Sequence, residues 1–362
     1  MQKIINDYNH LSDILDLSKY NNVLVVCDNF LLNSFFLNYL KKINSNIHTF
    51  TSFKPNPKYE EVLEGIKVFK ENNCDLIVAV GGGSAIDVAK TIKAFVNLNE
   101  EQNYLDQKIV KNDINLLAVP TTAGTGSEST QFAVIYYEGN KYSIDSEYIL
   151  PNFVLLESKF LESLPLYQKK STMLDALCQG IESYWSVNST DESKKYAKKA
   201  IKIILENYKD YINEKEEVYS KIMEASNYSG KAINISKTTA AHAMSYKITS
   251  LYGVSHGHAV ALCLPYIWEY MIENLELVSD IRGKEYLETV FNDLDLFFES
   301  SNHKETLLKL RQILNDINLN YTGIAKEKDI NLLSSSVNEN RLKNNPVKLN
   351  TETIEKIYRK LM

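Results

Sequence analysis

Residue types that bind transition metals lie close together in the second half of the chain. Asp175 and Gln179 are four positions apart in LDALCQGIE, so on a helix their side chains share one face and could converge on one ion. His242 and His256 follow, and Gly253 predicts a helix break between them. A carboxylate with two imidazoles from separate segments suits Zn²⁺ or Fe²⁺ and leaves room for a substrate oxygen. The alternative is a hydrogen-bonded core histidine at 242 and a helix cap at 256.

Histidine and glycine are scarce in this chain of 362 residues, so their clusters indicate specific needs. Three of the six histidines, His242, His256 and His258, fall within 17 consecutive positions. Five of the 13 glycines fall in two short loops, one at 81–83 and one at 124–126. We expect the chemistry of the protein in these two clusters.

The string GGGS at 81–84 follows a predicted buried strand, and Ser84 begins a predicted helix. Unhindered backbone N–H groups and a helix N-terminus there suit a phosphate or pyrophosphate. A second loop, TTAGTGS at 121–127, follows the next strand and adds hydroxyl groups. Ligands of open α/β sheets bind at the carboxyl ends of strands, so the two loops together predict a nucleotide site. The alternative is two tight strand-to-helix turns, and the GxGxxG motif is absent because Ile86 stands where its third glycine belongs.

An acidic residue at the end of the first predicted strand bears on which nucleotide binds. Asp28 follows this strand in VLVVCDNF. In a dinucleotide-binding fold an acid at a strand end binds the ribose hydroxyls of adenosine and repels a 2′-phosphate, which favours NAD over NADP. The alternative is that Asp28 serves a turn or caps a helix.

The elements that must position these residues follow two patterns. Short runs of branched residues first alternate with amphipathic stretches, which is typical of a mainly parallel sheet covered by helices. We expect strands at 22–27, 46–50, 75–80 and 115–120, a helix at 31–43, a second helix with Pro57 in its first turn and a β-hairpin turning at 138–140. After about residue 160 helical periodicity continues nearly to the end. The sequence therefore predicts a Rossmann-like dinucleotide-binding domain over 1–160 and an all-helical domain for metal and substrate over 161–362.

The composition excludes several classes of function. With 44% hydrophobic and 24% charged residues, the chain is typical of a globular protein. The net charge of −6 comes without a basic block, which argues against nucleic-acid binding. No apolar run approaches the roughly 18 residues that span a bilayer, and the four scattered cysteines fit a reducing compartment. We expect a cytoplasmic protein that binds neither nucleic acid nor membrane.

Taken in order, the motifs resemble those of the iron-containing (group III) alcohol dehydrogenase family. The strings that carry the resemblance are GGGSAIDVAK, VPTTAGTGSEST, FAVI with KYSI, LDAL with IES, and HAMSY with SHGHAVAL. They cover essentially the whole chain at family-like spacing. The resemblance implies the dehydroquinate synthase-like architecture of this family: an NAD(P)-binding α/β domain, a helical domain with one divalent metal, and an active site in the cleft between them.

The resemblance also assigns roles to individual residues. It puts the metal on Asp175, His242 and His256, which the spacing had already suggested, and it links Asp28 with NAD preference. It places the cofactor pyrophosphate and the further cofactor contacts at Gly81, Gly82, Gly83, Ser84, Thr121, Thr122, Thr125, Ser127 and Lys141.

Two positions depart from the family pattern. The family usually has histidine where this chain has Gln179, and a second histidine where it has Tyr246. Gln179 either offers a neutral amide oxygen, a weaker ligand than imidazole, or stays outside the ligand set, so Fe²⁺ and Zn²⁺ are both candidates. Tyr246 and His258 are our candidates for passing a proton to or from the substrate oxygen, with packing as the alternative role for Tyr246.

Within the family, three segments resemble phosphonoacetaldehyde reductases of phosphonate biosynthesis most: DALCQGIESYWSVNST, KTTAAHAMSYKITSLYGVSHGHAVAL and NRLKNNPVKL. A phosphonate dianion needs cationic partners, and Lys231, Lys237 and Arg341 are our candidates. The alternative is that they are solvated cations in a lysine-rich chain.

We therefore expect a metal-dependent, NAD(H)-linked aldehyde reductase that works as a homodimer, with NADP(H) as the alternative cofactor. The expected reaction converts phosphonoacetaldehyde to 2-hydroxyethylphosphonate. The alternatives are another alcohol, polyol or semialdehyde dehydrogenase, or a dehydroquinate synthase-like lyase, on the same scaffold. A non-catalytic nucleotide-binding relic with a decayed metal site is the third interpretation.

Overall fold

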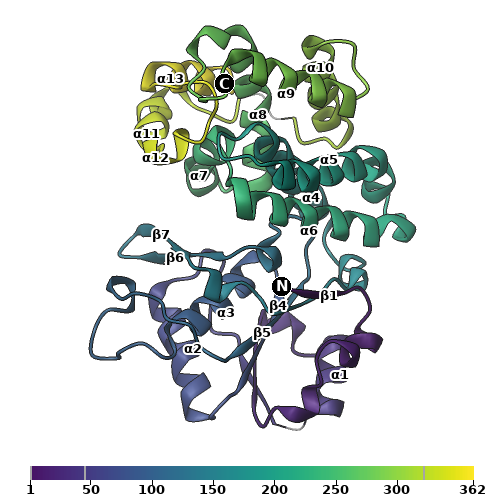
Figure 1. Ribbon diagram of the computed structural model, residues 1–362, viewed down its shortest axis with the longest axis vertical. Helices are drawn as coiled ribbons and strands as arrows, with labels where there is room; N and C mark the ends of the chain where they lie inside the picture. The colour runs from purple at the N-terminus through teal and green to yellow at the C-terminus, as the bar shows by residue number, and fades with distance from the viewer. Residues whose placement is uncertain (1, 45, 321–322) are drawn as a thin grey trace. The chain divides into compact units, whose positions relative to one another are not determined.

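Short runs of branched residues form the parallel sheet that the sequence predicts. In the computed structural model, which describes residues 2–44, 46–320 and 323–362, six strands pair in the order β1-β8-β5-β4-β2-β3, and all of these pairs are parallel (Figure 1). The strands are β1 (Lys3–Ile5), β2 (Val23–Cys27), β3 (Ile47–Phe50), β4 (Leu76–Gly81), β5 (Asn115–Pro120) and β8 (Phe153–Leu155).

Helices cover both faces of this sheet. On one face, α2 (Tyr59–Glu71) and α3 (Gly83–Phe95) share a core with Leu24 and Ile77. On the other face, α1 (Phe35–Ile43) shares a core with the residues that precede and follow Leu24 and Ile77 in their strands. Successive strand residues point to opposite faces, so a sheet covered twice needs strands that are apolar throughout.

A β-hairpin follows the sheet, with its turn where the sequence predicts it. β6 (Phe132–Tyr137) pairs antiparallel with β7 (Asn140–Asp145). Glu138 and Gly139 both have positive φ, 51° and 77°, as the favoured two-residue hairpin turn requires.

The rest of the chain is helical. The helices are α4 (Leu166–Trp185), α5 (Asp191–Ile212), α6 (Tyr219–Ser236), α7 (Ala240–Tyr252), α8 (His256–Glu273), α9 (Lys284–Phe297), α10 (His303–Asp316), α11 (Ile330–Ser335), α12 (Glu339–Leu342) and α13 (Thr351–Arg359). α4 packs against α5, α6 and α8 (Figure 1). Gly253, at φ 68°, ends α7 as predicted.

Contacts between Cα atoms divide the chain into two compact units. The first holds the chain through Thr122 together with Gly126–Ser163, and the second holds Ala123–Thr125 and Leu164–Met362. The predicted fold class, an α/β part with a mainly parallel sheet followed by a helical part, is confirmed. Among the described residues, none of the helices combines the length and apolar character needed to cross a bilayer.

Several boundary predictions were wrong. The three-residue strands β1 and β8 were missed because such short runs carry too little alternation to be detected. Pro57 lies just before α2 and not in its first turn, because Lys58 is the N-cap. α1 begins at Phe35, since the hydroxyl of Ser34 accepts a hydrogen bond from Leu37 N and caps the helix there.

Candidate metal centre and nucleotide-binding turns

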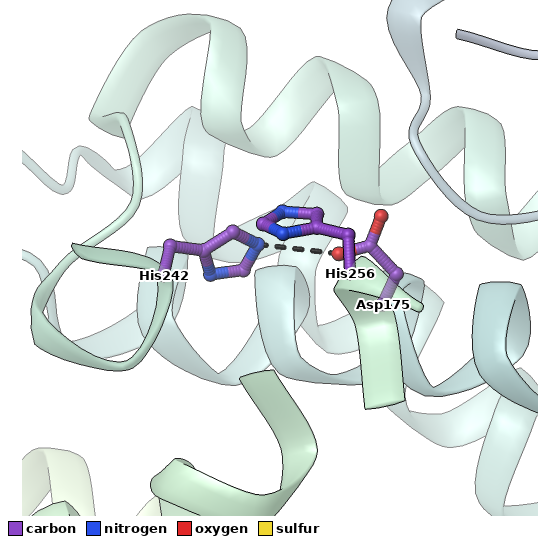
Figure 2. Close-up of side chains that lie close together, drawn as sticks. All are labelled: Asp175, His242 and His256. Atoms are coloured by element: carbon purple, nitrogen blue, oxygen red, sulfur yellow. Dashed lines mark hydrogen bonds and ion pairs between the residues drawn. The ribbon is translucent and has the colours of Figure 1, made fainter. Parts of the chain in front are cut away.

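Three ligand-type side chains from three helices meet in the helical unit. Asp175 comes from α4, His242 from α7, and His256 is the first residue of α8. One ligand atom from each lies within 4.8 Å of the other two. Figure 2 shows the three side chains turned toward one another, with Nε2 of His242 3.3 Å from Oδ1 of Asp175. The structure thus brings together the three residues that the sequence singled out.

Both imidazoles are held so that Nε2 is the nitrogen left for a ligand role. Nδ1 of His242 is hydrogen-bonded to Oε2 of Glu182, a carboxylate that can only accept, so Nδ1 carries the proton. Nδ1 of His256 lies 3.3 Å from Oγ of Ser245, whose single proton goes to the His242 carbonyl oxygen at 2.9 Å. Ser245 therefore accepts from His256. One carboxylate and two such imidazoles fit a divalent ion.

The electrostatics of this cluster favour positive charge. Burial by itself raises the pKa of Asp175, but the hydrogen bond from His242 and the charges of His256 and His242 lower it below its ordinary value. Burial opposes a charged His242, yet Glu182 and Asp175 raise the pKa of His242 to about 9. A cluster that stabilises carboxylate and imidazolium in the interior is also suited to a metal cation.

Gln179 lies beside the cluster with its amide oxygen turned away. Its Nε2 lies 3.3 Å from the carbonyl oxygen of Thr125, and its side chain also hydrogen-bonds Asp175. Both neighbours accept hydrogen bonds, so the amide nitrogen has to face them. Oε1, the atom able to ligate a metal, accepts from Oγ of Ser229 at 2.9 Å.

The two candidate proton donors are placed differently. The ring of Tyr246 is stacked on that of His256, and its hydroxyl accepts a hydrogen bond from Nη1 of Arg341 at 2.7 Å. His258 is buried, and its ring nitrogens are engaged by the Tyr167 hydroxyl at 3.2 Å and the Leu319 carbonyl oxygen at 2.9 Å. Burial lowers the pKa of His258. The cluster therefore has Tyr246 as its neighbour, whereas both ring nitrogens of His258 are occupied elsewhere.

The three candidate cations also differ in their surroundings. Arg341 reaches the cluster through Tyr246, and its guanidinium lies 5.0 Å from the centre of that ring. Lys231 lies over the rings of Tyr196 and Tyr228. Lys237 follows α6 with φ 61° and ends that helix.

The first glycine turn joins the second at the carboxyl ends of β4 and β5. Thr121 N donates to the carbonyl oxygen of Gly81 at 3.0 Å, and Thr122 lies against Gly82. A Cβ atom on Gly81 would lie 2.6 Å from Cβ of Ala85 and 3.1 Å from Oδ2 of Asp28, so only glycine fits there. α3 begins at Gly83 and includes Ser84, so the N-terminus of this helix lies in the turn, as expected for a phosphate site.

Asp28 lies against this glycine turn, and burial raises the pKa of its carboxyl group. It is the N-cap residue of the short η3 (Asn29–Leu31), but its side chain makes no capping hydrogen bond there. Asp28 thus stands at a cap position, as the alternative expects, but its carboxyl group makes no cap hydrogen bond.

The second loop rests on the half-buried Asp87 and the buried Lys90, which sequence reasoning missed. The hydroxyl of Ser127 donates to Asp87 at 2.8 Å, and the charges of Lys90 and Lys141 act on the same carboxylate, whose pKa is raised by burial. Nζ of Lys90 contacts four oxygens: Ser127 O, Ser127 Oγ, Thr130 Oγ1 and Phe132 O. Asp87 and Lys90 are three residues apart in GGGSAIDVAK, and this shared helix face was the available signal.

Part of the second loop packs within the helical unit. A Cβ on Gly124 would lie 2.6 Å from the carbonyl oxygen of Thr172 on α4, and Thr125 contacts Gln179. Glu182 was also missed, although it follows Asp175 by seven residues and so shares its helix face.

Known proteins are similar to this chain over nearly its whole length. The model of the iron-containing alcohol dehydrogenases matches residues 2–158, and that of the C-terminal part of the Fe-containing alcohol dehydrogenase family matches residues 169–362. A solved structure of sulfoacetaldehyde reductase from Bifidobacterium kashiwanohense in complex with NAD⁺ is similar, with a TM-score of 0.88 and 25% identity, covering 100% of this chain and 96% of that one.

Two curated relatives align over part of their lengths. Aldehyde-alcohol dehydrogenase 2 of Entamoeba histolytica is 29% identical over 72% of this chain and 32% of its own length. Phosphonoacetaldehyde reductase of Streptomyces viridochromogenes is 31% identical over 54% of this chain and 53% of its own length. The alignments thus span about a third and about half of these two proteins. On the two family models, which together match nearly all of it, the chain belongs to the iron-containing alcohol dehydrogenase family.

Proposed function

We propose that this chain catalyses the NAD(P)H-linked reduction of a small aldehyde to its alcohol, and the reverse oxidation. The observation that carries the proposal is the convergence of Asp175, His242 and His256 within 4.8 Å in a member of this family. A bound nicotinamide would supply the hydride for the carbonyl carbon, and a proton for its oxygen completes the balance, in which RCHO, NAD(P)H and H⁺ become RCH₂OH and NAD(P)⁺.

The helical domain, residues 161–362, would hold one divalent ion, Fe²⁺ or Zn²⁺, on Asp175, His242 and His256. Such an ion supplies a Lewis acid that polarises a carbonyl oxygen. The chain's own part is to hold the Nδ1 protons of both imidazoles in hydrogen bonds to Glu182 and Ser245, so that Nε2 is the nitrogen that would release its proton and bind the ion. Oε1 of Gln179 is turned away from the cluster and toward Ser229, which supports a ligand set of three residues.

The first domain, residues 1–160, would bind the dinucleotide. The pyrophosphate would lie at 81–84, where glycine leaves the backbone open and α3 begins. Asp28 beside Gly81 supports NAD(H) over NADP(H). Further contacts are proposed at Thr121, Thr122, Thr125, Ser127 and Lys141; Ser127 also fixes the loop through Asp87.

Tyr246 is the proposed proton donor to the substrate oxygen. Its ring lies on His256, so its hydroxyl is at the edge of the metal cluster, and the hydrogen bond from Arg341 stabilises a phenolate after the proton leaves. His258 was the other candidate, but its contacts with Tyr167 and Leu319 favour a packing role.

The proposed substrate is phosphonoacetaldehyde, reduced to 2-hydroxyethylphosphonate. Arg341 supports this choice, because a guanidinium beside the metal cluster could pair with the phosphonate dianion. The names of the Streptomyces and Bifidobacterium proteins support an aldehyde that carries an acidic group. Lys237 and Lys231 are the further candidates; the aromatic contacts of Lys231 make it the weakest.

The test is an assay of NADH oxidation with phosphonoacetaldehyde, sulfoacetaldehyde, succinic semialdehyde, glyceraldehyde and acetaldehyde. We expect the highest kcat/KM for phosphonoacetaldehyde. Arg341→Met should raise the KM for this substrate and leave that for acetaldehyde unchanged, whereas the control Arg359→Met, which removes an arginine paired with Glu327, should change neither. A preference for a neutral aldehyde or polyol would contradict the substrate and support another dehydrogenase of the family.

We further propose that the enzyme works as a homodimer in the cytoplasm. The four cysteines, all buried and free, fit a reducing compartment. Light scattering after gel filtration tests the dimer.

A further inference from the structure

A buried carboxylate outside the ligand set touches both a proposed metal ligand and the beginning of the helix that carries it. Glu182 lies on α4 and is 0% exposed. It follows Asp175 by two helical turns, so both carboxylates lie on the same side of α4. A buried carboxylate is stable only when hydrogen bonds compensate for lost hydration, so its partners indicate its role.

One oxygen of Glu182 caps α7. Oε1 accepts from Thr239 Oγ1 at 2.7 Å, from Thr239 N at 3.2 Å and from Ala241 N at 2.8 Å. The first N–H groups of a helix have no partners within it, and Thr239, the N-cap residue, makes no side-chain capping bond of its own. A negative charge at this position is also favourable for the helix dipole.

The other oxygen sets the proton of His242. Oε2 is hydrogen-bonded to Nδ1 of that ring. Because a carboxylate only accepts hydrogen bonds, one proton stays on Nδ1, and Nε2, 3.3 Å from Oδ1 of Asp175, is the nitrogen that loses its proton when a metal binds. Without this contact either nitrogen of a neutral imidazole can carry the proton, and a protonated Nε2 cannot bind a metal.

We infer that Glu182 is a positioning residue that fixes the start of α7 and the tautomer of His242 together, and so sets the metal affinity without touching the metal. The inference rests on the proposed function, because it takes Asp175, His242 and His256 as the ligands. The two oxygens of Glu182 have separate roles: Oε1 holds the start of α7, and Oε2 fixes the tautomer of His242. A single substitution can separate these roles.

The separating variant is Glu182→Gln. Its amide oxygen is expected to keep the hydrogen bonds from the donors at the start of α7. The amide NH₂ then faces Nδ1 of His242. Nδ1 must then accept, and the proton moves to Nε2. Replacing an orienting carboxylate by its amide changes the histidine tautomer while the geometry stays intact. We expect Zn²⁺ affinity, measured by competition with a chromogenic chelator, to fall about 10- to 100-fold.

Asp295→Asn is the matched control. Asp295 is also buried and accepts from Nδ1 of His303 at 2.6 Å, so the chain holds a second carboxylate–histidine pair on α9 and α10, outside the metal cluster. This variant should lower the melting temperature but leave Zn²⁺ affinity unchanged. Unchanged affinity in Glu182→Gln, or an equal loss in both variants, would overturn the inference.

A measurement on the wild-type chain needs no variant to fold. In the ¹⁵N spectrum of the Zn²⁺-loaded protein, His242 should show a protonated Nδ1 and a metal-bound Nε2; zinc on Nδ1 overturns the inference. Asp175→Asn tests the proposed function separately. If wild type binds Zn²⁺ and Asp175→Asn binds it equally well, the ligand set is wrong, whatever Glu182→Gln does.

Discussion

The ring of Tyr246 lies flat on the ring of His256, with centroids 5.4 Å apart and planes within 6° of each other. At its far end the tyrosine hydroxyl accepts a hydrogen bond from Arg341. One side chain therefore contacts both a histidine of the proposed ligand set and a partly buried cation. Tyr246 thus links the metal cluster to an arginine.

Tyr246→Phe tests the hydroxyl alone, because phenylalanine keeps the stacking on His256. We expect kcat for aldehyde reduction to fall about 100-fold, the scale of a lost general acid, with metal content unchanged. Tyr184→Phe, which removes a hydroxyl bonded to Asp293, should not change kcat. A wild-type kcat in Tyr246→Phe would remove Tyr246 as the proton donor.

Substitutions of Gln179 test whether it lies outside the ligand set. Gln179→Met replaces the amide by a thioether, a poor ligand for Fe²⁺ or Zn²⁺, and because Oε1 already faces Ser229 we expect one metal per chain to be retained in metal analysis. Gln179→His adds an imidazole beside Asp175, and we expect a chelator to remove the metal more slowly than from wild type. Loss of the metal from Gln179→Met would show that the amide is a ligand.

Asp28→Ala tests the choice of dinucleotide. Removing the carboxylate beside Gly81 removes the repulsion of a 2′-phosphate, so the ratio of kcat/KM for NADPH to that for NADH should rise, by about 10-fold or more if the charge repulsion is worth about 1.4 kcal/mol. Asp75→Ala is the control. Asp75 precedes β4 at its other end, where it accepts from Asn21 N and Asn22 N, and the ratio should stay unchanged. An unchanged ratio in Asp28→Ala contradicts the assignment.

The buried Lys90 predicts a pH dependence of stability. Burial lowers its pKa from 10.5 to about 8 in the folded protein, so between these pH values the unfolded chain binds more protons than the folded one. The free energy of unfolding of wild type should therefore rise with pH from about 8 to 10.5, relative to Lys90→Met. Burial also lowers the pKa of Lys93 to about 8, but Lys93 is present in both proteins, so its contribution cancels in the comparison. Denaturant titrations across this range check it, and parallel curves throughout would contradict it.

Sequence spacing predicted the features that depend on local periodicity. Asp175, His242 and the helix break at Gly253 were evident because ligand types and helix signals are short-range. Glu182 was missed because its role depends on the start of another helix, α7, where its partner Thr239 lies 57 residues further along the chain. Likewise, the direction of the Gln179 amide depends on an acceptor, Thr125 O, and a donor, Ser229 Oγ, from two other segments of the chain. Such partner choices come from tertiary packing, which the pattern of a single helix does not contain.

On the proposed function, aldehyde reduction requires one metal held by Asp175, His242 and His256. The most direct measurement is NADH oxidation with an aldehyde by chelator-treated protein, titrated with Zn²⁺ or Fe²⁺. We predict no activity without metal and full activity at one equivalent per chain, and none at any metal concentration for Asp175→Ala, although NADH still binds. Full activity in the metal-free protein would contradict the proposed function.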